Sequence, residues 1–129
     1  MKLTEEHVQQ AFASILRDVG FEVREEVRYG GKRFDVVARL NGSFFGFEVK
    51  LHDWRRALRQ LRAYQLCCDR AFLVKYGQAS EDLIRECSAA GVGLYVIESI
   101  GADPRQVTPS KRSTSWSRHF SASLMRAFL

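Results

Sequence analysis

The stretch RFDVVARLNGSFFGFEVKL, residues 33–51, decides the fold, because apolar residues recur on both sides of a strong turn signal. Asn41-Gly42 favours a two-residue type I′ turn, which fixes how the flanking strands pair. We therefore expect a β-hairpin with one strand over about residues 33–40 and the other over about residues 43–51.

The predicted register sorts the hairpin side chains into two faces. Counting back from the turn gives an apolar face, on which Val36 meets Phe47, and Phe34 is expected to meet Val49 on the same face. A slip by one residue would mix apolar and polar positions, so this pattern supports the register. On the other face, Asp35 lies opposite Glu48, and Lys50 lies on that face too.

Two facing carboxylates require an explanation. Facing residues have Cβ atoms about 4.5 to 5.5 Å apart, where like charges destabilise a sheet. Mg²⁺ or Mn²⁺ bound by Asp35 and Glu48 would offset the repulsion, because hard cations prefer oxygen ligands. Lys50, about 7 Å from Glu48 along the strand, could then orient or deprotonate a water or stabilise a charged transition state. The alternative is a solvated charge ladder on an exposed face.

The flanking segments predict helices and further strands around the hairpin. Thr4 can cap a helix on whose apolar stripe Glu5 falls, which aims this carboxylate toward the core side. An alternative is that Glu5 only favours the positive end of the helix dipole. The expected order is helix 4–19, strands 21–28, 33–40 and 43–51, helix 53–68, strand 71–75, helix 80–90 and strand 93–97. This α-β-β-β-α-β-α-β order predicts an α/β fold, with a mixed sheet and helices on both faces.

The chain of 129 residues has the size of one domain. We expect residues 1–98 to form the core and residues 99–129 to form a basic linker and a C-terminal helix or tail, which could cap the core, bind a partner or exchange between subunits. An acidic start and the absence of a long apolar run predict a cytoplasmic protein without a membrane segment. Three cysteines without CxxC spacing suggest neither a disulfide framework nor a zinc site.

The charge distribution favours a polyanionic partner. The formal net charge is +5, and the segment from Ser99 onward contains five Lys or Arg residues but only one acidic residue. Arg55, Arg59 and Arg62 form one stripe of the second helix and could contact phosphates, with Lys111 and Arg112 of the tail as a second contact. A solvated basic helix face is the alternative.

Asp35 followed by Glu48-Val49-Lys50, in this order of elements, resembles the PD-(D/E)XK nuclease superfamily over roughly residues 4–98. The resemblance implies a restriction-endonuclease-like core and a Mg²⁺- or Mn²⁺-dependent nuclease that hydrolyses DNA, with RNA left open. It implies Asp35, Glu48 and the Val49 carbonyl as metal ligands and Lys50 as the catalytic lysine. Glu5 matches the glutamate that many members carry on the first helix.

Two branches of the superfamily look nearest. The size and the segment EEHVQQAFASILRDVGFEVREEV resemble archaeal-type Holliday junction resolvases, which are small dimers, so a homodimer and a role in DNA repair or recombination are implied. Gln60-Leu61-Arg62-Ala63-Tyr64 looks like the QxxxY motif of RecB-type nucleases, and Gln60 is a candidate nucleic-acid contact. The alternative function is a catalytically silent nucleic-acid-binding module of this fold, acting within a larger complex.

Overall fold

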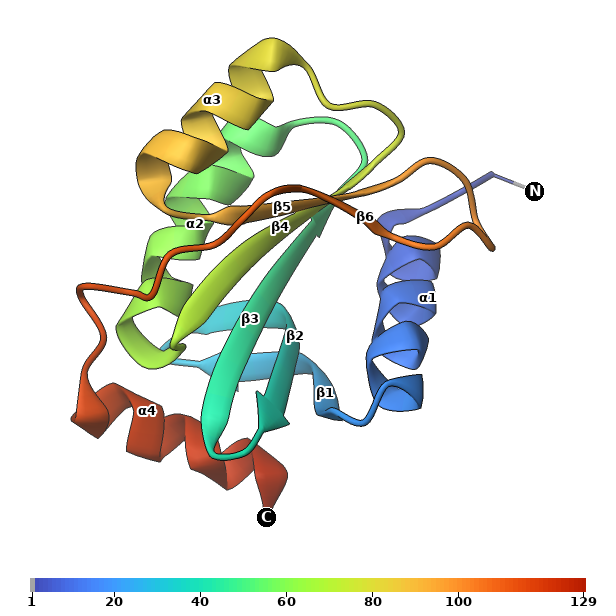
Figure 1. Cartoon of the computed structure of the whole chain (residues 1–129). Helices are drawn as coiled ribbons and strands as arrows, with labels where there is room; N and C mark the ends of the chain where they lie inside the picture. The colour runs from blue at the N-terminus through green and yellow to red at the C-terminus, as the bar shows by residue number, and fades with distance from the viewer. Residues whose placement is uncertain (1) are drawn as a thin grey trace.

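The protein is described by a computed structural model covering residues 2–129, and its sheet is built outward from the predicted hairpin (Figure 1). Strands β2 (Lys32–Leu40) and β3 (Ser43–Lys50) pair antiparallel, with Leu40 opposite Ser43. Asn41 and Gly42 have φ angles of 52° and 81°, the positive values that a type I′ turn requires. The predicted register is therefore confirmed from the turn as far as Val36 and Phe47.

Six strands form one mixed sheet in the order β1-β2-β3-β4-β5-β6. β1, β2 and β3 form an antiparallel meander, β3, β4 and β5 run parallel, and β6 pairs antiparallel with β5. The remaining strands are β1 (Glu22–Tyr29), β4 (Arg70–Tyr76), β5 (Gly93–Ile97) and β6 (Arg105–Thr108). The carboxyl ends of β3 and β4 lie side by side, where Lys50 pairs with Lys75.

Helices cover both faces of this sheet (Figure 1). The helix α1 (Glu5–Asp18) buries Val8, Phe12 and Leu16 against one face, and Thr4 caps it by accepting a hydrogen bond from the His7 N–H. The opposite face is covered by α2 (Trp54–Cys67), α3 (Glu81–Ala90), α4 (Arg118–Leu124) and the 3₁₀ turn η1 (Met125–Phe128). The predicted fold class, an α/β mixed sheet with the element order of a restriction-endonuclease-like core, is confirmed.

The segment after residue 98 contributes to the fold in two ways that its polar sequence does not indicate. Arg105–Thr108 forms the edge strand β6, where we expected a linker. Leu124 and Phe128 are buried with residues of α2 and β3, so the terminal helix caps the core, which is one of the three predicted alternatives. No helix within residues 2–129 is both long enough and apolar enough to cross a bilayer.

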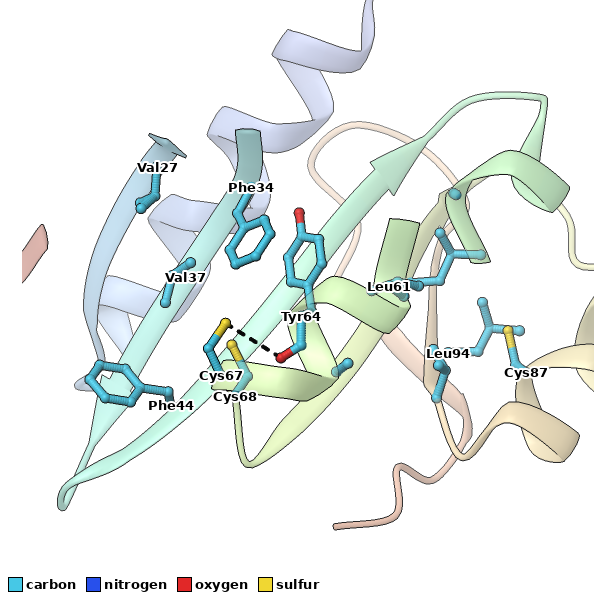
Figure 2. Close-up of a cluster of buried hydrophobic side chains, with 14 of the residues drawn as sticks. Val27, Phe34, Val37, Phe44, Leu61, Tyr64, Cys67, Cys68, Cys87 and Leu94 are labelled. Atoms are coloured by element: carbon cyan, nitrogen blue, oxygen red, sulfur yellow. Dashed lines mark hydrogen bonds between the residues drawn. The ribbon is translucent and has the colours of Figure 1, made fainter. Parts of the chain in front are cut away.

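The prediction for Phe34 was wrong. Phe34 lies on the α2 face with Val27, whereas Val36, Phe47 and Val49 lie on the α1 face. The cause is a kink shared by β1 and β2: Glu26 adopts a left-handed φ of 53°, and Glu26 and Asp35 do not pair, although the register is the same on both sides of them. The kink reverses the alternation beyond it, and Figure 2 shows the Phe34 ring beside the ring of Tyr64 on α2.

Candidate functional site

Strands β2 and β3 separate at Asp35, and side chains replace the lost backbone pairing. Val36 is the last residue of β2 in register with β3. Beyond it, the Val49 N–H donates to Asp35 Oδ2 over 2.9 Å, and the Asp35 N–H donates to the Tyr64 hydroxyl over 2.8 Å. The sheet therefore forks where Asp35 and Glu48 lie, and both acids are buried, with 9% and 4% exposed.

Tyr64 holds the two acidic residues together from the α2 side. Its hydroxyl accepts from the Asp35 N–H and donates to Glu48 Oε1 over 2.6 Å. Its ring stacks on Phe34 with centroids 4.0 Å apart and lies over Gly46, where a Cβ atom would come within 2.3 Å of Tyr64 Cδ2. The absence of a side chain at Gly46 is therefore a condition for the position of Tyr64.

The paired acids have strongly perturbed protonation. Burial, followed by the charge of Asp35, raises the pKa of Glu48 to about 8. Burial also raises the pKa of Asp35, against the hydrogen bond from the Val49 N–H. Because burial and the neighbouring Asp35 charge both disfavour ionisation of Glu48, whose pKa is about 8, we expect the metal-free pair to keep a proton at neutral pH.

Lys50 and Glu5 lie at the mouth of the fork. Lys50 Nζ is 3.9 Å from Glu5 Oε1, and Glu5 Oε2 accepts a hydrogen bond of 3.0 Å from the Leu51 N–H. The Lys50 side chain is 20% exposed, and that of Glu5 is 45% exposed. Glu5 thus connects the start of α1 to the end of β3 and holds the ammonium group beside the buried acids.

These side chains converge on one cavity of about 540 Å³, called here the candidate pocket. All four predicted catalytic residues line it, and so do the predicted nucleic-acid contact Gln60 and the hydroxyl-bearing Tyr64. The lining residues are Glu5, Arg28, Gly31, Lys32, Arg33, Phe34, Asp35, Glu48, Lys50, Gln60 and Tyr64.

The donor set fits a hard divalent cation with few protein ligands. Within residues 2–129, no group of three or more His, Cys, Asp or Glu side chains is arranged to hold a metal ion. Asp35 and Glu48 offer two carboxyl groups, and Mg²⁺ commonly binds one or two carboxylates and keeps several waters. Burial and then the Asp35 charge raise the pKa of Glu48, so a bound cation would stabilise the ionised pair.

The three arginines of α2 lie beside the candidate pocket. Arg55, Arg59 and Arg62 line a groove of about 880 Å³, called here the arginine groove. Arg55 also lies 3.8 Å from Asp82 and 4.3 Å from the centre of the Trp54 ring. Lys32 lines this groove and the candidate pocket, so the two cavities adjoin.

The structure places Lys111 and Arg112 away from the candidate pocket. Lys111 packs over Gly91 at the end of α3, and Arg112 lies 3.6 Å from Asp69. Asp69 accepts a hydrogen bond from the Phe44 N–H at the start of β3, and Lys50 lies six residues further along this strand, a distance of about 20 Å. These two predicted contacts do not join the other candidates.

Sequence reasoning missed three cations and one positioning group. Arg28, Lys32 and Arg33 line the candidate pocket from the hairpin that joins β1 to β2. Pairing residues across the Gly30-Gly31 turn would have placed Arg28 opposite Arg33, as the structure does. Tyr64 was recognised only as part of a motif, because nothing in the local sequence indicates which atoms its hydroxyl contacts.

The fold and the pocket together define an α/β protein whose mixed sheet forks between β2 and β3 around a buried acidic pair. A scan against protein-family models finds no match, and a search of curated proteins finds none. The comparison with solved structures shows similarity at the level of the fold.

The structure of SPO1766, a protein of unknown function from Silicibacter pomeroyi, aligns with a TM-score of 0.72 and 23% identity over 99% of this chain and 86% of that one. AF1548, also of unknown function, aligns with a TM-score of 0.60 and 20% identity over 72% of this chain and 58% of that one. Pyrococcus furiosus SfsA in complex with Ca²⁺ aligns with a TM-score of 0.49 and 17% identity over 82% and 64% of the two chains.

Proposed function

We propose that the protein is a metal-dependent deoxyribonuclease, of the structure-selective endonuclease type used in DNA repair or recombination. The observation that carries the proposal is the convergence of Glu5, Asp35, Glu48 and Lys50 on one pocket beside cationic side chains. A charged pocket of this kind suits a phosphodiester, whose reaction builds negative charge that the site must stabilise.

The residues of the candidate pocket have different roles in the proposed reaction. Asp35 and Glu48 would hold the cation, with the Val49 carbonyl as a further ligand. When bound, Mg²⁺ or Mn²⁺ would lower the pKa of a water molecule and neutralise negative charge on the phosphate. The Lys50 ammonium orients the attacking water and stabilises charge on the phosphate oxygens, while Glu5 holds Lys50 in place.

Tyr64 serves as a positioning residue. Its hydroxyl donates to Glu48 and accepts from the backbone of Asp35. This arrangement fixes both acids before a cation arrives, which lowers the reorganisation that binding requires.

A cleavage panel tests the proposal. Single strands, nicked duplexes, flaps and four-way junctions are incubated with Mg²⁺ or Mn²⁺, and we expect cleavage that Lys50→Ala abolishes and that Lys2→Ala, a matched lysine outside the pocket, retains. Mn²⁺ is also expected to raise the melting temperature of the native chain, since it binds only the folded site, and to leave that of Asp35→Asn unchanged.

The second candidate is a catalytically silent nucleic-acid-binding module that acts within a larger complex. The observation favouring it is that the arginine groove is formed without the acidic pair. Salt-sensitive DNA binding by the native chain, with no cleavage of any substrate in the panel, would establish this candidate and exclude the first.

A further inference from the structure

The candidate pocket shares one lining residue with each of two further cavities, and both shared residues lie at the tip of the β1–β2 hairpin. Lys32 is shared by the candidate pocket and the arginine groove. Arg28 is shared by the candidate pocket and a third cavity of about 720 Å³ between β1 and α4, called here the tail groove. Each of the two outer cavities therefore adjoins the candidate pocket through one cation of the hairpin tip.

The two shared residues are cations without acidic partners. Among residues 2–129, neither Arg28 nor Lys32 has a carboxylate within 4 Å. Arg28 faces Arg33 across the hairpin, an arrangement of like charges that is unfavourable unless an anion lies nearby. Arg33 has Glu26 at 3.4 Å, so Arg28 is the one left uncompensated. This hairpin tip therefore fits a polyanion.

Both outer grooves combine cations with apolar surface. The arginine groove contains Trp54, Leu58 and Leu66 beside its arginines. The tail groove contains Tyr29 and Phe120, of which Phe120 is 38% exposed, together with Arg24 and Arg126 at its side. Proteins that bind single-stranded nucleic acid combine positive charge for the backbone with apolar and aromatic surface for the bases. A duplex would leave the apolar part unused, because its bases are stacked inside.

We propose that a single-stranded DNA segment crosses the candidate pocket, with Lys32 and the α2 arginines on one side of the cut and Arg28 on the other. The inference rests on the proposed nuclease function and specifies its substrate. In the reaction, a water oxygen bonds to phosphorus, one P–O bond to a sugar breaks, and the leaving sugar oxygen takes a proton. Since the strand is held on both sides, the cut is internal and needs no free end.

The first experiment compares covalently closed circular single strands, linear single strands and blunt duplexes with Mg²⁺ or Mn²⁺. We expect the native chain to linearise the circle and to cut the duplex far more slowly. Arg28→Ala combined with Lys32→Ala should raise KM for the circle about tenfold, since two exposed charge contacts are lost, with little change in kcat. Arg85→Ala combined with Arg105→Ala, which removes two exposed cations outside the groove, should change neither value.

The second experiment measures binding of a single-stranded oligonucleotide in EDTA as salt is varied. The slope of log K against log salt should become shallower by about 1.4 in the Arg28→Ala, Lys32→Ala variant, because each phosphate contact on a single strand contributes about 0.7. An unchanged slope, or duplex binding as strong as single-strand binding, would overturn the inference.

The outcomes separate this inference from the proposed function. Digestion of linear strands only from their ends, with intact circles, would overturn the inference and leave a nuclease. Binding with the expected change in slope, but no cleavage of any DNA, would overturn the nuclease proposal and retain the strand path.

Discussion

At the scale of single residues, the protonation of Glu48 determines how the metal-free protein responds to pH. An unfolded glutamate has a pKa of about 4.3, whereas burial and Asp35 raise the pKa of Glu48 in the fold to about 8. Between these values, the folded state holds a proton that the unfolded state has lost. The free energy of unfolding should therefore fall as pH rises from about 5 to 8.

The variant Glu48→Gln tests this response, because glutamine cannot ionise and can still accept the hydrogen bond from Tyr64. We expect the variant to be more stable than the native chain at pH 8 and to lose most of the decline between pH 5 and 8. Urea unfolding in EDTA at several pH values gives the comparison. Parallel curves for the two proteins would show that Glu48 is ionised in the fold.

Tyr64 offers a second test at this scale. Tyr64→Phe keeps the ring on Phe34 but leaves the buried Asp35 N–H without its acceptor and Glu48 without its donor. We expect a loss of about 1–3 kcal/mol in unfolding free energy, together with weaker Mn²⁺ binding. Tyr29→Phe is the control, since its hydroxyl makes an exposed hydrogen bond to the Phe120 carbonyl. Equal losses in both variants would contradict a special role for Tyr64.

At the scale of elements, α2 and β3 approach closely because Gly46 has no side chain. An added Cβ would lie 2.3 Å from the Tyr64 ring, so Gly46→Ala should destabilise the fold by about 1–3 kcal/mol and also move the hydroxyl that holds Glu48. Both the unfolding free energy and the Mn²⁺ affinity should therefore fall.

Gly93→Ala separates these two effects. A Cβ at Gly93 would lie 2.4 Å from Phe72, a buried residue of the α1 face that does not line the candidate pocket. We expect a similar loss of stability with unchanged Mn²⁺ affinity of the folded protein. Equal weakening of Mn²⁺ binding in both variants would mean that the effect follows from general destabilisation.

The elements also show which features can be predicted from sequence. The hairpin register followed from Asn41-Gly42, because a two-residue turn sets pairing locally. The face of Phe34 did not, because it depends on the left-handed conformation of Glu26, a residue type that does not signal such a kink. Strand β6 was missed since four mostly polar residues at a sheet edge carry no apolar pattern.

The candidate site divides in the same way. Glu5, Asp35, Glu48 and Lys50, which the sequence grouped, line one pocket, and three of them lie on the predicted hairpin. Lys111 and Arg112 were grouped with the site only by their charge. Charge composition does not say where a segment lies, and the path of the chain after β5 places both residues elsewhere.

At the scale of the whole molecule, the C-terminal helix completes the core on the α2 face. Phe128 is 7% exposed, packs on Phe44 with centroids 5.6 Å apart, and has the Arg24 and Arg39 guanidinium groups about 5 Å from its ring centre. Phe128→Ala should cost about 3–5 kcal/mol of unfolding free energy. Leu129→Ala is the control, because Leu129 is 98% exposed. An equally small effect of both variants would show that the helix contributes little to folding.

The fork between β2 and β3 has a consequence for how such a protein can change over generations. At the fork, the Asp35 carboxylate accepts the Val49 N–H and the Tyr64 hydroxyl accepts the Asp35 N–H. Burying two carboxyl groups side by side costs folding free energy. Selection for thermal robustness alone would favour neutral replacements at these positions. A lineage that keeps Asp35 and Glu48 therefore keeps a less stable fold. Such a loss of stability is expected where selection maintains a functional site.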